Sequence, residues 1–237
     1  MIGKYIYDAA LKGDARIKEQ LKVVKSILNS VVIVHESDRK LAADLDKFDR
    51  FNASLAASHD LLHSAIESGS FIEIIAISAN QIDAYLRLSI VIAKQISSQS
   101  NDIDVKYFYQ ADDERGIMER KIYERALDNG VIDNESFNEL SSLYQLRNRV
   151  IHRYIISNIK TRDLCEIAER YLAAVESIRL VLAGLEKAQA KERYGVYGKM
   201  LGKADVTDPD TIQRLYADAN DKHLLRKFKR KIGNAET

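Results

Sequence analysis

The chain has 237 residues, which is enough for a full hydrophobic core in one large domain or in a core domain with extensions. Ten glycines and one proline argue against repeated turns and Pro/Gly-rich disorder, and 46% hydrophobic residues exclude intrinsic disorder as the main state. The formal net charge of +1 produces no overall field that would select a nucleic acid or a membrane, so any basic patch must be local.

Cysteine content and hydropathy predict a soluble, cytoplasmic protein. The single cysteine, Cys165, cannot form an intrachain disulfide, which fits a reducing compartment. The N-terminal residues reach Asp8 before any apolar segment of signal-peptide length occurs. The most apolar stretch, 71–93, is interrupted by three charged residues. We therefore expect it to be a buried helix and not a membrane span.

The first predicted helical region covers residues 15–67, where neither glycine nor proline occurs. Apolar residues follow alternating steps of four and three from Ile17 to Val31, and most positions do so again from Leu41 to Ile66. This spacing is typical of amphipathic helices, but the two runs are out of phase and a polar segment separates them. A helical hairpin and one long helix with a stutter both fit this pattern.

Four more helices are predicted between residues 71 and 191. The first, 71–96, is apolar on nearly every side, so we expect it to be central and buried. The second, 117–127, ends at a stop signal that contains Gly130, and the third covers 135–156. The fourth has apolar residues in steps of four and three over 164–185. Candidate N-caps are Asp133 or Asn134 for the third helix and Thr161 or Asp163 for the fourth. Short connections favour antiparallel packing.

The C-terminal part is predicted to be a linker followed by a helix. This helix begins at Asp208-Pro209, a favourable cap and first position, and ends in a basic run, 226–231. The sequence thus predicts an all-α protein in three parts. They are an N-terminal helical arm, 1–60, a helical bundle, 61–191, and a linker with a C-terminal basic helix, 192–237.

Polar residues interrupt the apolar face of the helix predicted over 135–156. At about 100° per residue its apolar side chains form one broad arc, and Arg147 lies in the middle. A guanidinium cannot lose its charge, so Arg147 must meet an acid, reach water or face a groove. Asn148 and His152 stack one turn apart at an edge of the arc, with Arg147 and His152 about 140° apart around the axis.

Two interpretations of this helix are open. In the first, Arg147 pairs with a core acid, such as Asp83 on the central helix, and His152 is a partly exposed surface histidine. In the second, one cation and one titratable imidazole border a functional face. Spacing alone does not decide between a structural and a functional role.

The residues in this segment resemble the signature of HEPN-domain proteins. In that signature an Arg is followed by Asn, Asp or His and, four to six residues on, by His; here Arg147 and Asn148 precede His152. The extension to Tyr154, Arg-four residues-His-x-Tyr, looks like the HepT-type toxin branch of that superfamily. The resemblance covers residues 61–191, roughly half of the chain, and implies a HEPN-like antiparallel four-helix bundle.

The resemblance further implies a dimeric, metal-independent endoribonuclease without a cofactor, or a catalytically silent relative. RNA transesterification needs a group that takes the 2′-hydroxyl proton, a group that protonates the leaving oxygen, and positive charge near the phosphorane. A two-fold axis beside this helix would supply two histidines. His152 is then base or acid, Arg147 binds the scissile phosphate, and Asn148 orients phosphate or imidazole.

The expected partners follow from the same resemblance. They are RNA, a second copy of the chain, and an antitoxin or nucleotidyltransferase in a toxin–antitoxin or phage-defence setting. Such a nucleotidyltransferase modifies with AMP the tyrosine that matches Tyr154; the alternative is that Tyr154, which lies within the apolar arc, packs there and supports the site. The cations expected to contact RNA are Arg149, Arg153, Lys227, Lys229 and Arg230. The alternative function is a non-catalytic dimerisation or adaptor module in which Arg147 and His152 are structural.

Other polar clusters carry weaker signals. His59 and His63 lie one turn apart with Asp60 between them, but no matching third ligand is evident, so we expect no metal site. The acidic run 112–114 stands just before a predicted helix, where the helix dipole favours it. No Gly-rich phosphate loop and no GxSxG motif occur, which disfavours the common α/β hydrolases.

Overall fold

A computed structural model describes residues 36–111, residues 113–198 and residue 213. Within this part of the chain the secondary structure consists of five α-helices and one 3₁₀ turn, without strands, so the predicted all-α class is confirmed. The compact unit begins at Leu41. The apolar run 17–31, and with it the choice between hairpin and long helix, lies outside the described residues, as does the basic helix expected over 208–231.

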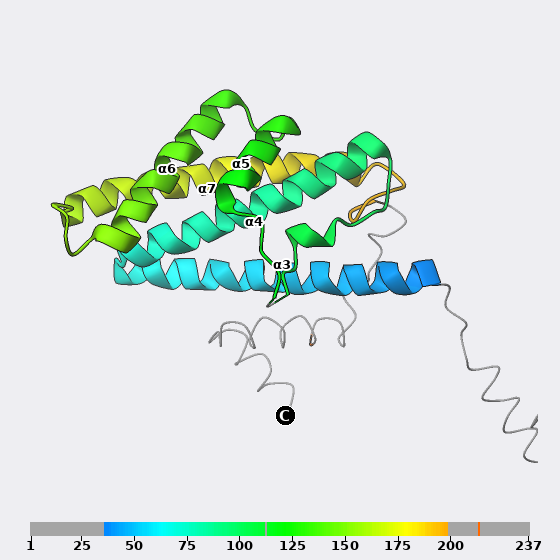
Figure 1. Ribbon diagram of the computed structural model, residues 1–237, viewed down its shortest axis with the longest axis horizontal. Helices are drawn as coiled ribbons and strands as arrows, with labels where there is room; N and C mark the ends of the chain where they lie inside the picture. Colours follow the sequence, from blue (N-terminus) through cyan, green and yellow to red (C-terminus); the bar gives the residue numbers. More distant parts are fainter. Residues whose placement is uncertain (1–35, 112, 199–212, 214–237) are drawn as a thin grey trace, which may run out of the picture. The chain divides into compact units, whose positions relative to one another are not determined.

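The first two described helices form an antiparallel pair. Helix α3, Glu36–Ser68, ends at Gly69, whose positive φ of 66° reverses the chain, and α4, Phe71–Ser98, then runs back along it (Figure 1). The boundary that we placed at residue 60 falls inside α3, which is continuous there. Two hydrogen bonds tie the pair together: Gln81 Nε2 donates to Ser58 Oγ at 3.0 Å, and Tyr85 Oη lies 2.9 Å from His59 Nε2.

Helix α4 is the core of the described structure. It contacts α5, α6, α7 and the 3₁₀ turn Val105–Tyr107. Its fully buried residues point in several directions around the axis, as the pattern of apolar residues predicts; they include Ile75, Ile82, Leu86, Ile90 and Ile92. By length and composition α4 could cross a membrane, but 67% of its most apolar window is buried inside the protein, as in the core helix of a soluble protein.

Local signals set the ends of the remaining helices. Helix α5, Glu119–Asp128, ends before Gly130, which has a φ of 66°. Helix α6, Asn134–Arg153, begins at the predicted cap, where Asp133 accepts a hydrogen bond from Ser136 N at 2.8 Å. Its predicted end at residue 156 is wrong by one turn: the chain leaves the helix after Arg153, and the β-branched residues that follow face solvent.

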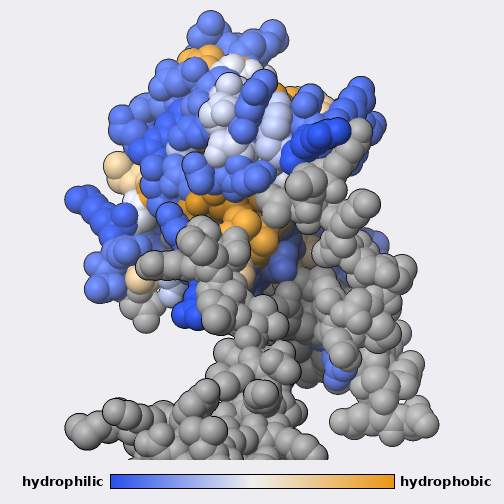
Figure 2. Space-filling model, turned by 90° about the vertical axis from the view of Figure 1, so that its right-hand side faces the viewer, coloured by the Kyte–Doolittle hydropathy of each residue, from blue (hydrophilic) through white to orange (hydrophobic). Residues whose placement is uncertain are grey.

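Helix α7, Thr161–Gln189, packs on α4 and α6. Neither candidate residue is its N-cap; Lys160 takes that place, and Asp163 stabilises the start by accepting from Lys160 N at 2.9 Å. The face drawn in Figure 2 is mainly hydrophilic, with a smaller hydrophobic area visible between polar residues. This distribution is expected when the apolar side chains of helices fill a common core.

The first residues of the predicted linker pack against the core. Val196 is buried, and its backbone N–H donates to Gln95 Oε1 at 3.2 Å. Gln189 Nε2 donates to the same oxygen at 3.0 Å, and Gln189 Oε1 accepts from Tyr197 N at 2.9 Å. The composition of this segment indicated a linker, but two buried glutamines satisfy its backbone and hold it in place.

Candidate functional site on helix α6

Helix α6 has one side in the core. Leu140, Leu143 and Val150 are at most 2% exposed on this side. The Tyr171 hydroxyl, from α7, donates to the Leu143 carbonyl at 2.8 Å. These contacts fix the rotation of α6 about its axis, and thereby decide which of its polar residues face the interior and which face solvent.

Arg147 lies on the core-facing side and has an acidic partner. Its Nη1 is 2.7 Å from Glu119 Oε2 of α5, and the two side chains are only 19% and 14% exposed. The guanidinium also lies over the Tyr144 ring, 5.0 Å from its centroid. The suggestion that Asp83 is the partner is wrong: Asp83 Oδ2 pairs with Arg87 Nε at 2.5 Å.

The ion pair belongs to a larger, partly buried network. Glu119 accepts a short hydrogen bond from the Tyr123 hydroxyl. Burial raises the pKa of the Glu119 carboxyl, and the Tyr123 hydrogen bond and the Arg147 charge oppose that rise. Burial also raises the pKa of Asp83, against the charges of Arg87 and Arg147. Two carboxylates and two guanidiniums thus stabilise one another in a poorly solvated region.

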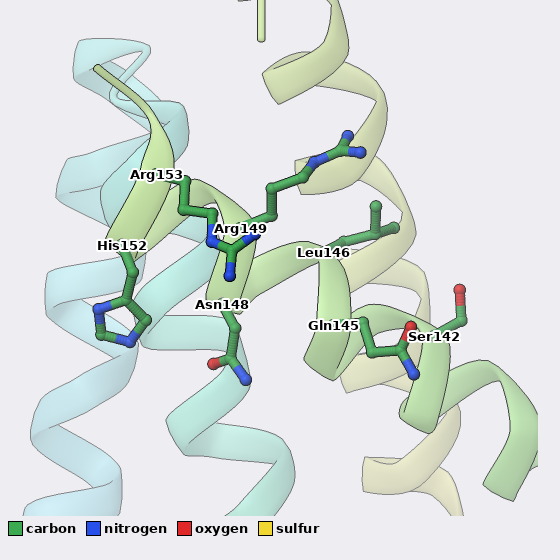
Figure 3. Close-up of a pocket in the computed structure, with 7 residues that line it drawn as sticks. All are labelled: Ser142, Gln145, Leu146, Asn148, Arg149, His152 and Arg153. Carbon is green, nitrogen blue, oxygen red and sulfur yellow. The ribbon is translucent and has the colours of Figure 1, made fainter. Parts of the chain in front are cut away.

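The opposite side of α6 carries an open groove of about 600 Å³. Its lining residues all come from α6 and are drawn in Figure 3: Ser142, Gln145, Leu146, Asn148, Arg149, His152 and Arg153. None of them is acidic, whereas two are arginines and one is a histidine. His152 and Asn148 lie next to each other at one edge, and Arg149 extends away from them (Figure 3).

Asn148 connects the two sides of the helix. Its Oδ1 accepts a hydrogen bond of 3.0 Å from Arg147 Nη2, while its side chain also lines the groove. Four of the predicted site residues therefore lie together in the groove: Asn148, Arg149, His152 and Arg153. Arg147 is absent from the lining and reaches this place through Asn148.

Of the remaining predicted site residues, the structure describes Tyr154 alone. Tyr154, just past the end of α6, is 39% exposed and does not line the groove. Lys227, Lys229 and Arg230 lie outside the described residues. Glu119 was missed by sequence reasoning, which looked for an acid on the most buried helix. The sequence does contain a signal for Glu119: it lies one turn before Tyr123, on the apolar face of a short amphipathic helix.

The two histidines of α3 have ordinary structural partners. His59 bonds to Tyr85, and burial lowers the pKa of its imidazole, with the Arg179 charge adding to the effect. His63 Nε2 is 3.1 Å from Glu67 Oε1. Over the described ranges no three His, Cys, Asp or Glu side chains come together in a way that could hold a metal ion.

Comparisons of this chain with protein-family models, curated proteins and solved structures find no match. An exposed imidazole can transfer protons near neutral pH, an amide can donate and accept hydrogen bonds, and guanidiniums bind phosphate oxygens in pairs. Together these groups can bind a phosphodiester and move a proton beside it.

Proposed function

We propose that the protein is a metal-independent endoribonuclease whose site lies in the α6 groove and is completed by a second copy of the chain. The observation that carries this proposal is the composition of the groove, which holds one imidazole, two amides and two guanidiniums but no carboxylate. The surrounding sequence supports it, because no Asp or Glu occurs from residue 140 to residue 162. Such a surface attracts a polyanion such as RNA.

The reaction is transesterification at an RNA phosphodiester. An imidazole removes the 2′-hydroxyl proton, the 2′ oxygen bonds to phosphorus, and the bond from phosphorus to the 5′ oxygen breaks. A second group, acting as an acid, gives the leaving oxygen a proton, so the products are a 2′,3′-cyclic phosphate and a 5′-hydroxyl. His152 is suited to these proton transfers because its side chain is exposed in the groove.

A second copy is needed because one His152 cannot fill both proton roles in one encounter. Apolar side chains beside the groove support such an interface. Four of them are exposed at and beyond the end of α6: Ile151 at 43%, Tyr154 at 39%, Ile155 at 94% and Ile156 at 83%. A self-complementary contact around a two-fold axis would remove this surface from water and place two grooves together.

The wider setting follows from the HEPN resemblance. We propose a HEPN-like arrangement of the bundle, a role in toxin–antitoxin or phage-defence biology, and a location in the cytoplasm. Tyr154 is exposed in the single chain, so a partner nucleotidyltransferase would reach it before two copies associate, and the bulky AMP group would then lie within the proposed interface and oppose it.

A second candidate function is a non-catalytic dimerisation or adaptor module. One observation favours it specifically: Arg147 forms a partly buried ion pair with Glu119, which is the structural role that the first interpretation gave to this arginine. The exposed isoleucines would also suit an adaptor, in which they would form the docking surface.

Cleavage of RNA by purified protein in EDTA tests the proposal. The His152→Ala variant should lower the cleavage rate by about 10²–10⁴-fold, the contribution of a positioned acid or base. His63→Ala, which removes an exposed histidine from α3, is the matched control and should cleave like wild type. If wild-type protein freed of bound partners leaves total RNA intact, the adaptor function should replace the nuclease.

A further inference from the structure

We infer that Arg147 and Glu119 form a fixed pair that positions Asn148 in the groove, and that Arg149 and Arg153 make the contacts to substrate phosphate. This inference rests on the proposed nuclease function and assigns roles within the same site. It changes the role of Arg147 from a phosphate ligand to a positioning residue, and it adds Glu119, a residue of a different helix, to the site.

Arg147 is held from three directions. One terminal nitrogen pairs with Glu119, the other donates to Asn148, and the Tyr144 ring covers a face of the guanidinium. Glu119 is itself held by the Tyr123 hydroxyl. A side chain with these contacts and 19% exposure is preorganised, and turning toward a ligand would break several contacts at once.

The charge of Glu119 also argues against a role of Arg147 as a phosphate ligand. A phosphate that captured Arg147 would leave Glu119 without its cation at 14% exposure, near Asp83, and a poorly solvated carboxylate without a cation is unfavourable. Arg149 and Arg153 have no comparable carboxylate partner. Both are exposed in the groove, and neither forms an ion pair with any described residue. Their charges are therefore free to meet the RNA backbone.

The hydrogen bond to Arg147 also fixes which end of the Asn148 amide faces the groove. A guanidinium only donates, so the amide oxygen must point toward Arg147. The amide nitrogen then remains available to donate to a phosphate oxygen or to the imidazole one turn away. Without Arg147 the amide could flip and present an acceptor to an anionic substrate, which would weaken the site.

The salt dependence of RNA binding separates a phosphate ligand from a positioning residue. The probe is a single-stranded oligonucleotide with 2′-deoxy residues, which cannot be cleaved, measured by fluorescence anisotropy at several salt concentrations. Arg149→Gln and Arg153→Gln should each reduce the slope of log affinity against log salt by about 0.7, the value for one phosphate contact on a single strand. Arg147→Gln should leave the slope unchanged and lower kcat about tenfold or more.

The Glu119→Gln variant should weaken the site if Arg147 is a positioning residue and should strengthen RNA binding if Arg147 is a phosphate ligand. If Glu119 positions Arg147, this variant lowers kcat, and the double variant with Arg147→Gln is no slower than either single variant. If Arg147 is a phosphate ligand that Glu119 restrains, the same variant frees it, so RNA binds more tightly and the slope increases. Tyr123→Phe keeps every charge and should lower kcat less than Glu119→Gln does; circular dichroism checks that each variant is folded.

The outcomes distinguish this inference from the proposed function. A wild-type protein that binds and cleaves RNA, together with a reduced salt slope for Arg147→Gln or tighter binding for Glu119→Gln, overturns the inference alone. A wild-type protein that neither binds nor cleaves RNA overturns both.

Discussion

The arginines on the two sides of helix α6 have different surroundings. On the side that faces α5 and α7, Arg147 is surrounded by Glu119, Asn148 and the Tyr144 ring. On the groove side, Arg149 and Arg153 are exposed and have no carboxylate partner among the described residues. Identical side chains within seven residues of one helix therefore have different surroundings on its two faces, because the carboxylate of Glu119, from α5, lies on the core-facing side alone.

This difference bears on how a short motif is interpreted. Arg147 and His152 belong to one motif, yet they point about 140° apart around the helix axis. In the structure they do not line the same surface, and Asn148 is the only described link from the arginine to the groove. The residue types of the motif suggest a shared task, whereas in the structure Arg147 pairs with Glu119 and His152 lines the groove.

The largest expected difference between the two sides is in stability. Leu143→Ala should lower the free energy of unfolding by about 2–5 kcal/mol, because Leu143 is 1% exposed and its loss leaves a cavity. Leu146→Ala makes the same chemical change one turn away on the groove side, and should cost less than about 1.5 kcal/mol because Leu146 is only partly buried against the core and also lines the open groove. Urea unfolding measures both, and equal losses would contradict the division of α6.

Association of two copies should depend on the apolar residues beyond the groove. Replacing Ile155 and Ile156 with Ser should weaken the dimer about tenfold or more, which is about 1.4 kcal/mol, without changing the fold of one chain. Sedimentation equilibrium at micromolar concentration measures this effect. Leu180→Ser, at a 57% exposed position of α7, is the control. A monomeric wild-type protein would remove the composite site.

A smaller loss is expected from one hydroxyl on the buried side. Tyr171→Phe removes the donor to the Leu143 carbonyl and should lower the free energy of unfolding by about 1 kcal/mol. Cleavage by this variant should be close to wild type at temperatures where it is folded, since Tyr171 does not line the groove. A large loss of activity with little loss of stability would mean that the core contacts of α6 control the site directly.

The smallest effect is a pH dependence of stability that Glu119 contributes. Burial raises the pKa of this carboxyl above its ordinary value of 4.5. The folded protein therefore holds the proton more tightly than the unfolded chain, and the stabilisation, complete below pH 4.5, is lost as the pH rises through the raised pKa. Relative to Glu119→Gln, wild type should become less stable with rising pH over that window. Thermal unfolding between pH 4 and 7 measures the difference, and a constant offset would contradict it.

Local features of the sequence determined most helix boundaries. Gly69 and Gly130 end helices because a positive φ is easy for glycine, and Asp133 begins one because its carboxylate can reach a free backbone N–H three residues on. The apolar surface of α4 on nearly all sides identified the core helix. These signals act within one or two turns of the chain, so they are visible without a structure.

Tertiary structure decided the polar contacts and thereby the division of the site. Glu119 is 28 residues from Arg147, and nothing in the spacing of either residue favours this partner over Asp83, which the fold pairs with Arg87. The docking of residues 195–197 depends in the same way on Gln95 of α4, about a hundred residues earlier, which accepts from Val196 N and from Gln189 Nε2. Helix periodicity specifies which face of a segment is apolar, but the partner of a buried charge depends on how the helices pack, because an ion pair needs two atoms within a few ångströms irrespective of their separation in sequence.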